Sequence, residues 1–176
     1  GEEIKHFSES REDSYYSFPK EELNHLHEES KRNLQSGYNE LINPGDSKLS
    51  SNAETVQYLV SNSPGRALHI DILKKFEIGI GVEKFRDSDG EYLSVPVIYY
   101  PMKGKPHVKN KEEYLNVKFK ARGVGSKFKR HQRIIPSKAL FGLFGLQTFP
   151  QEGFPDCVVL TEGEYDAMAV HQATGL

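Results

Sequence analysis

The spacing of the apolar residues changes at Glu77, and this change restricts the chain to folds that combine helices with a sheet. Before that point, apolar residues recur at helical intervals, which predicts one helix over 21–42 and two short helices within 51–76. An Asn-Ser-Pro-Gly break at 62–65 separates the two short helices. The first half of the chain is therefore expected to be helical.

After Glu77 the spacing is that of extended strands. Strands are predicted at 78–85 and 92–100, and the Asp-Ser-Asp-Gly turn between them is typical of a hairpin. Pro96 lacks a backbone N–H, so we expect the second strand to be an edge or irregular strand. Helices followed by strands of this kind predict the α+β class.

The charge of the chain is divided unevenly along its length. The segment 103–138 holds 12 of the 23 Lys and Arg residues but only two of the 25 Asp and Glu residues, which gives it a charge of +10. The rest of the chain carries −12, so the net charge of −2 conceals a strongly basic segment. Such a segment favours a polyanionic partner, although a solvated lysine-rich loop has the same composition.

Within this segment, residues 114–122 alternate between apolar and polar positions, as a strand buried on one face does. The apolar positions are Leu115, Val117, Phe119 and Ala121, and the polar ones are Asn116, Lys118, Lys120 and Arg122. Alternate strand residues lie about 6.5–7 Å apart, which suits the phosphates of a single-stranded nucleic acid or a nucleoside triphosphate. A solvated hairpin is the alternative.

More cations follow this strand. A glycine loop at 123–126 precedes a basic run that includes Phe128, an aromatic ring able to stack on a base. The basic residues that we expect to bind nucleic acid or nucleotide here are Lys127, Lys129, Arg130, Arg133 and, further on, Lys138.

The end of the chain places carboxylates after an apolar run. Residues 156–160 predict a short buried parallel strand, and a helix is expected from Ala167 to Thr174, ending at Gly175. Ligands bind at the carboxyl edge of such sheets, where Glu162 would project. Glu164 and Asp166 lie in the opening turn of the helix, where carboxylates serve either as metal or acid-base groups or simply as helix-stabilising charges.

Other features exclude several classes of protein. The chain has no stretch of 18 apolar residues, and its N-terminal sequence is too acidic for a secretory or transit signal, so we expect no membrane partner. Cys157 is the only cysteine, which excludes an internal disulfide and a four-cysteine zinc ribbon, so no zinc is expected in this chain. Its apolar surroundings in the sequence predict that Cys157 is a core residue.

Four stretches, in the correct order, resemble the primase part of Twinkle-like and phage-type primase-helicases. The sequence Val-Val-Leu-Thr-Glu-Gly-Glu-Tyr-Asp-Ala-Met-Ala at 158–169 resembles the first Toprim motif, and 171–176 is similar to its continuation. Ala-Leu-Phe-Gly at 139–142 resembles the sequence that precedes Toprim. Leu-Lys-Lys-Phe-Glu-Ile-Gly at 73–79 resembles the opening of the primase core.

The resemblance implies a primase-type core with a mixed sheet. Residues 51–150 would be a basic N-terminal lobe, and 151–176 the first strand and helix of a Toprim α/β lobe. The resemblance does not cover residues 1–50, whose polar composition and single helical run predict a helical or partly disordered extension. The family's Toprim carboxylates bind Mg²⁺ for phosphoryl transfer, which implies a catalytic role for Glu162 and a metal set of Glu162, Glu164 and Asp166. The sequence ends at Leu176, before the second Toprim strand and the Asp-x-Asp that complete this site in the family, so we expect this stretch to be inactive by itself.

The same resemblance implies the partners and the compartment. The partners would be single-stranded DNA, nucleoside triphosphates and a C-terminal helicase domain, in DNA replication. The compartment would be a mitochondrion or plastid in a eukaryote, and otherwise a phage-infected or bacterial cytoplasm. Two alternatives remain open: a non-catalytic DNA-binding module of a Twinkle-like helicase, or another Toprim enzyme such as a topoisomerase or nuclease.

Overall fold

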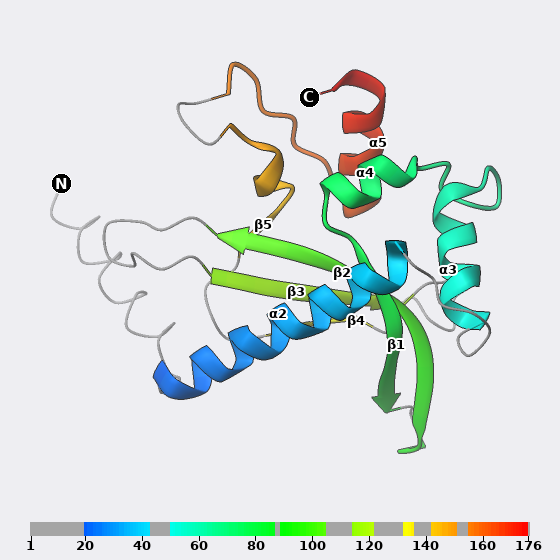
Figure 1. Ribbon diagram of the computed structural model, residues 1–176, viewed down its shortest axis with the longest axis vertical. Coiled ribbons are helices and arrows are strands. Elements are labelled where there is room, and N and C mark those ends of the chain that lie inside the picture. The colour runs from blue at the N-terminus through cyan, green and yellow to red at the C-terminus, as the bar shows by residue number, and fades with distance from the viewer. Residues whose placement is uncertain are drawn as a thin grey trace, which may run out of the picture.

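The computed structural model describes residues 20–42, 50–86, 89–104, 114–121, 132–135, 142–150 and 155–175 (Figure 1). Its α-helices are α2 (Lys20–Ile42), α3 (Ser50–Val60), α4 (Ile70–Lys75) and α5 (Glu164–Thr174). Its strands are β1 (Gly79–Arg86), β2 (Tyr92–Gly104), β3 (Tyr114–Ala121), β4 (Gln132–Ile135) and β5 (Leu143–Phe144), and a short 3₁₀ helix, η1, covers Leu146–Thr148. The three predicted helices of the first half and the hairpin are confirmed.

The strands form one five-stranded sheet in the order β1-β2-β3-β4, with β5 paired to β2. Every pairing among the described residues is antiparallel. The α+β class is therefore confirmed, but the expected mixed sheet is not found in this part of the chain.

β2 lies between β1 and β3, so it is not the edge strand that Pro96 suggested. Pro96 pairs with Val82 of β1, and the pairing with β3 begins one residue later, at Val97. Pro101 pairs with β3 beyond the end of the β1 pairing. Among the described strands, only β1 pairs with β2 at Pro96, and only β3 pairs with it at Pro101. A strand position that is paired on one side alone tolerates the missing N–H of proline.

Helices cover both faces of the sheet. α2 crosses the face that carries Val97 and Tyr99, where Leu34 packs against them (Figure 1). The helix comes very close at Gly37, because a Cβ there would lie 2.3 Å from Cδ2 of Tyr99. α3, α4 and α5 contribute to the larger core, on the face that carries Ile98 and Tyr100.

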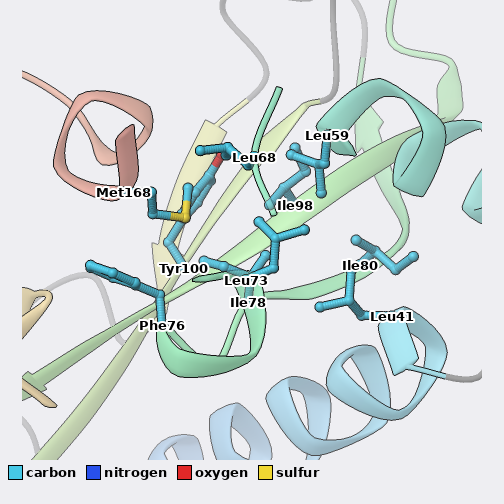
Figure 2. Packing of buried hydrophobic residues seen from close by; sticks show 10 residues of the cluster. All are labelled: Leu41, Leu59, Leu68, Leu73, Phe76, Ile78, Ile80, Ile98, Tyr100 and Met168. Atoms are coloured by element: carbon cyan, nitrogen blue, oxygen red, sulfur yellow. The ribbon is translucent and has the colours of Figure 1, made fainter. Parts of the chain in front are cut away.

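The larger core joins the end of the chain to the sheet. Figure 2 shows its ten buried residues: Leu41, Leu59, Leu68, Leu73, Phe76, Ile78, Ile80, Ile98, Tyr100 and Met168. Met168 of α5 is fully buried in this cluster, and His171 one turn later packs edge-on against Phe76 with ring centres 5.3 Å apart. This packing fixes α5 and thereby the position of its first turn beside β3.

The segment before α5 differs from the prediction. Residues 157–160 form no strand, and Val158, Val159 and Leu160 are 50%, 46% and 90% exposed. Cys157 is also exposed, so its assignment to the core was wrong. A parallel strand needs a neighbour to receive its backbone hydrogen bonds and cover its side chains. No described strand pairs with this segment.

The helix that follows agrees with the prediction at its C-terminal end. α5 begins at Glu164, three residues earlier than expected, and ends before Gly175, whose φ of 77° is the left-handed geometry that glycine adopts readily. None of the helices in the described ranges is long and apolar enough to cross a membrane.

Candidate functional site

The register of β3 places its two described lysines on one face of the sheet. Lys118 pairs with Tyr100 of β2, and Lys120 pairs with Ile98. Cross-strand partners share a face, so both lysines lie on the face of the larger core. The prediction that Lys118 and Lys120 lie side by side on one face is confirmed.

Both lysines contact one carboxylate, that of Glu164 at the start of α5. Nζ of Lys118 lies 2.5 Å from Oε1 of Glu164, and Nζ of Lys120 lies 3.5 Å from Oε2. The Glu164 side chain is only 9% exposed, whereas those of Lys118 and Lys120 are 23% and 37% exposed. A buried anion is therefore held between two cations, of which Lys120 is the more loosely engaged.

The surroundings of Glu164 favour its ionised form. Burial by itself raises the pKa of this carboxyl group, but the hydrogen bond from Lys118, a backbone hydrogen bond and the charges of Lys118 and Lys120 lower it more. The net result is a pKa below the usual value. Glu164 is thus an anion in the folded chain at neutral pH.

This lowered pKa predicts how stability depends on pH. Because the carboxyl pKa is lower in the folded chain than in the unfolded chain, its stabilising effect is fully present above the unfolded value, about 4.3. The effect is lost as the pH falls through the folded value. At pH 7 we expect Glu164→Gln to lower the free energy of unfolding by about 1–2 kcal/mol, and the difference from wild type should shrink in acid.

Urea unfolding of both proteins from pH 7 to pH 3 measures this difference. Glu162→Gln is the matched control, because Glu162 is exposed and lies just before the same helix. A Glu164→Gln effect that stays constant down to pH 3 would contradict the assignment of the ion pairs.

A second group of side chains surrounds Tyr165, the next residue of α5. The Arg66 guanidinium carbon lies 4.0 Å from the centre of the Tyr165 ring, and Nζ of Lys120 lies 5.7 Å from it. Nε of Arg66 donates a hydrogen bond of 2.8 Å to the Tyr58 hydroxyl. Burial raises the pKa of Tyr165 to about 12, so the ring keeps its proton beside the cations at neutral pH. Three cations, Arg66, Lys118 and Lys120, therefore meet at the first turn of α5.

The other two predicted carboxylates differ from Glu164 in their exposure to solvent. Glu162 and Asp166 are exposed, while Glu164 is directed to the lysines. In the described ranges, no three His, Cys, Asp or Glu side chains are arranged to hold a metal ion. The Mg²⁺ site and the catalytic role of Glu162 stay predictions.

Arg133 lies on the other face of the sheet. It pairs with Phe119 in register, between the lysine positions, and so belongs to the face opposite to theirs. Its guanidinium forms an ion pair with Glu83 and lies 5.3 Å from the centre of the Phe85 ring. The structure therefore does not bring Arg133 to Lys118 and Lys120. The other predicted binding residues lie outside the described residues: Arg122, Lys127, Lys129, Arg130 and Lys138.

The basic segment meets the acidic remainder of the chain. Lys103 pairs with Glu77 at 2.6 Å, Lys118 and Lys120 pair with Glu164, and Arg133 pairs with Glu83. Each described cation of 103–138 thus contacts a carboxylate from outside that segment. Part of the predicted charge contrast is neutralised by folding.

Arg66 and Tyr165 were not among the residues singled out from the sequence. Arg66 follows the break at 62–65 as an isolated cation, and Tyr165 stands among the carboxylates of the final motif. Their contact joins residues 99 positions apart in sequence, and no local pattern indicates such a pairing.

Searches of known protein-family models, curated proteins and solved structures found no match to this chain.

Proposed function

We propose that this chain binds single-stranded DNA through the lysine face of β3 and is the primase-like, DNA-binding part of a replicative primase-helicase. One observation carries the proposal: Lys118 and Lys120 converge on a single carboxylate at the start of α5. A site in which two ammonium groups hold one anion has the chemistry needed to hold a phosphate.

The two lysines differ in how readily a phosphate reaches them. The contact between Lys120 and Glu164 is long, 3.5 Å, and the lysine is 37% exposed, so a phosphate can engage this ammonium group while Lys118 keeps Glu164 in place. Lys118 is more buried and makes the shorter contact. Lys120 is therefore the first phosphate ligand in our proposal, and Glu164 competes with the phosphate for both lysines.

The primase assignment rests on the resemblance of 158–169 to the first Toprim motif. Glu162 precedes α5 and Asp166 lies in its first turn. Both are exposed, and carboxylate oxygens are donors that suit Mg²⁺. When bound, Mg²⁺ would activate the 3′ hydroxyl of a primer and stabilise the leaving pyrophosphate. The chain's own cations would neutralise template and nucleoside triphosphate. The helicase partner and the organellar, phage or bacterial setting belong to the same proposal.

A non-catalytic single-stranded DNA-binding module is the second candidate. The pairing of Glu164 with two lysines favours it, because a carboxylate already held by two ammonium groups is a poor ligand for a metal ion. The two candidates share the lysine face and differ only in the role of the exposed carboxylates.

The DNA-binding proposal predicts opposite effects of two substitutions. Lys120→Ala should weaken binding of a fluorescent oligo-dT about fivefold at 0.1 M salt, the effect expected when one phosphate contact is removed from a single strand. Glu164→Gln should strengthen binding, because it removes the competing charge. Fluorescence anisotropy of both variants measures these shifts.

Lys75→Ala is the matched control, since Lys75 is exposed on α4. It should leave the affinity nearly unchanged. Equal affinities for wild type and Lys120→Ala, or weaker binding by Glu164→Gln at a temperature where that variant is fully folded, would refute the lysine face as the binding surface.

A further inference from the structure

The loop that carries Arg66 is held firmly by its own backbone. The Arg66 N–H donates to the Tyr58 carbonyl at 2.9 Å, the Ala67 N–H to the Ser61 carbonyl at 2.9 Å, and the Leu68 N–H to the Leu59 carbonyl at 3.0 Å. Leu68 itself is 2% exposed and belongs to the larger core. Arg66 therefore extends from a segment whose backbone position is set on both sides.

α5 fastens the same loop from the opposite side. The side-chain amide of Gln172 accepts a hydrogen bond from the His69 N–H at 2.7 Å and donates one to the Ala67 carbonyl at 3.0 Å. The helix that carries Glu164 and Tyr165 is thus tied directly to the loop that carries Arg66. The spacing between Arg66 and the lysine face is fixed by these contacts.

The guanidinium of Arg66 is oriented as well as positioned. One side of it lies on the Tyr165 ring, 4.0 Å from the ring centre, and its Nε is bonded to the Tyr58 hydroxyl. The guanidinium carbon also lies 5.5 Å from the centre of the Tyr58 ring. Arg66 is nevertheless exposed, so part of its surface remains accessible to solvent. The Arg66 guanidinium is therefore a flat, permanently charged group whose rotation is restricted by its contacts with Tyr165 and Tyr58.

We propose that the exposed part of the Arg66 guanidinium stacks on a nucleobase of the single strand whose phosphate binds Lys120. The inference rests on the proposed DNA-binding function and adds a base subsite to it. Unstacked bases of single strands pack on arginine planes as well as on aromatic rings. Lys120 approaches the same Tyr165 ring, 5.7 Å from its centre, so the base and phosphate subsites are adjacent.

Lysine cannot replace arginine in this role. A lysine at position 66 keeps the positive charge but offers no flat surface to a base and no fixed donor geometry for the Tyr58 hydroxyl. Arg66→Lys therefore separates stacking from charge. It should leave the salt dependence of DNA binding nearly unchanged and reduce the contribution of the bases.

The test compares two ligands of equal length and charge, a fluorescent oligo-dT and the same strand with abasic sites throughout, on the 176-residue chain. We expect wild type to prefer oligo-dT by at least about fivefold, the low end of what one stacked base contributes, and Arg66→Lys to lose most of that preference. Arg86→Lys is the matched control, because Arg86 is an exposed arginine on β1 that bonds the Gly90 carbonyl. Melting temperatures confirm that the variants are folded.

The outcomes separate the two proposals. If Arg66→Lys keeps the preference for oligo-dT, or lowers the affinity for both ligands equally, the base subsite is wrong while the lysine face can still bind phosphate. If wild type binds neither ligand, the proposed function fails and the base subsite fails with it.

Discussion

Replacing Met168 with alanine is expected to lower the free energy of unfolding by about 2–5 kcal/mol, the range for removing a long buried side chain from a packed core. Met168 is fully buried among residues of α3, α4 and the sheet, and it is the residue of α5 that is buried in this core (Figure 2). Chemical unfolding monitored by circular dichroism gives the free energy directly.

Leu160→Ala is the control for this change. Leu160 is also a large apolar residue near the end of the chain, but it is 90% exposed, so its truncation should change the stability by less than about 0.5 kcal/mol. Similar effects of the two substitutions would mean that α5 is not packed on the sheet, and the position of Glu164 beside β3 would lose its support.

The second large effect is expected for Lys118→Met. This change removes the close partner of Glu164 and leaves the buried carboxylate with the longer contact to Lys120 as its remaining described ion pair. Removing one partner of a buried ion pair costs about 3–5 kcal/mol. The remaining contact with Lys120 places the expected loss near the lower end of that range. The double variant Lys118→Met/Glu164→Gln should recover most of that stability, because the carboxylate that lost its partner is no longer charged.

A double-mutant cycle on urea unfolding measures this coupling. Lys74→Met serves as the control, because Lys74 is 44% exposed and lies 3.9 Å from the exposed Asp71; it should have little effect. If the effects of Lys118→Met and Glu164→Gln simply add, the two side chains do not form the pair described here.

The local elements of the fold could be predicted from the sequence. The helical spacing of apolar residues over 21–42 and the turn before Tyr92 depend only on neighbours along the chain, and both predictions are confirmed. The alternation around Lys118 and Lys120 also correctly predicts that both lysines lie on the same face of the sheet. The spacing of apolar residues predicts these features because helices and strands are determined largely by residues that are close in sequence.

Long-range features could not be predicted in this way. The pairing of Lys118 with Glu164 joins β3 to α5 across 46 residues. From the sequence, Lys118 is expected to bind DNA and Glu164 to bind a metal ion, so their contact with each other is not predicted. The apolar run at 157–160 has the composition of a buried strand, but no described strand accompanies it. Arg133 fell on the opposite face because β4 pairs with β3 in a register that the sequence does not reveal.

The measurement that tests the central proposal most directly is the affinity of the 176-residue chain for oligo-dT across a salt series. If Lys118 and Lys120 each contact a phosphate, the logarithm of the association constant should fall linearly with the logarithm of the salt concentration, with a slope of about −1.4 or steeper. Lys120→Ala should make this slope shallower by about 0.7. An affinity that does not change with salt, or no binding at low salt, would contradict the proposal that this face binds single-stranded DNA.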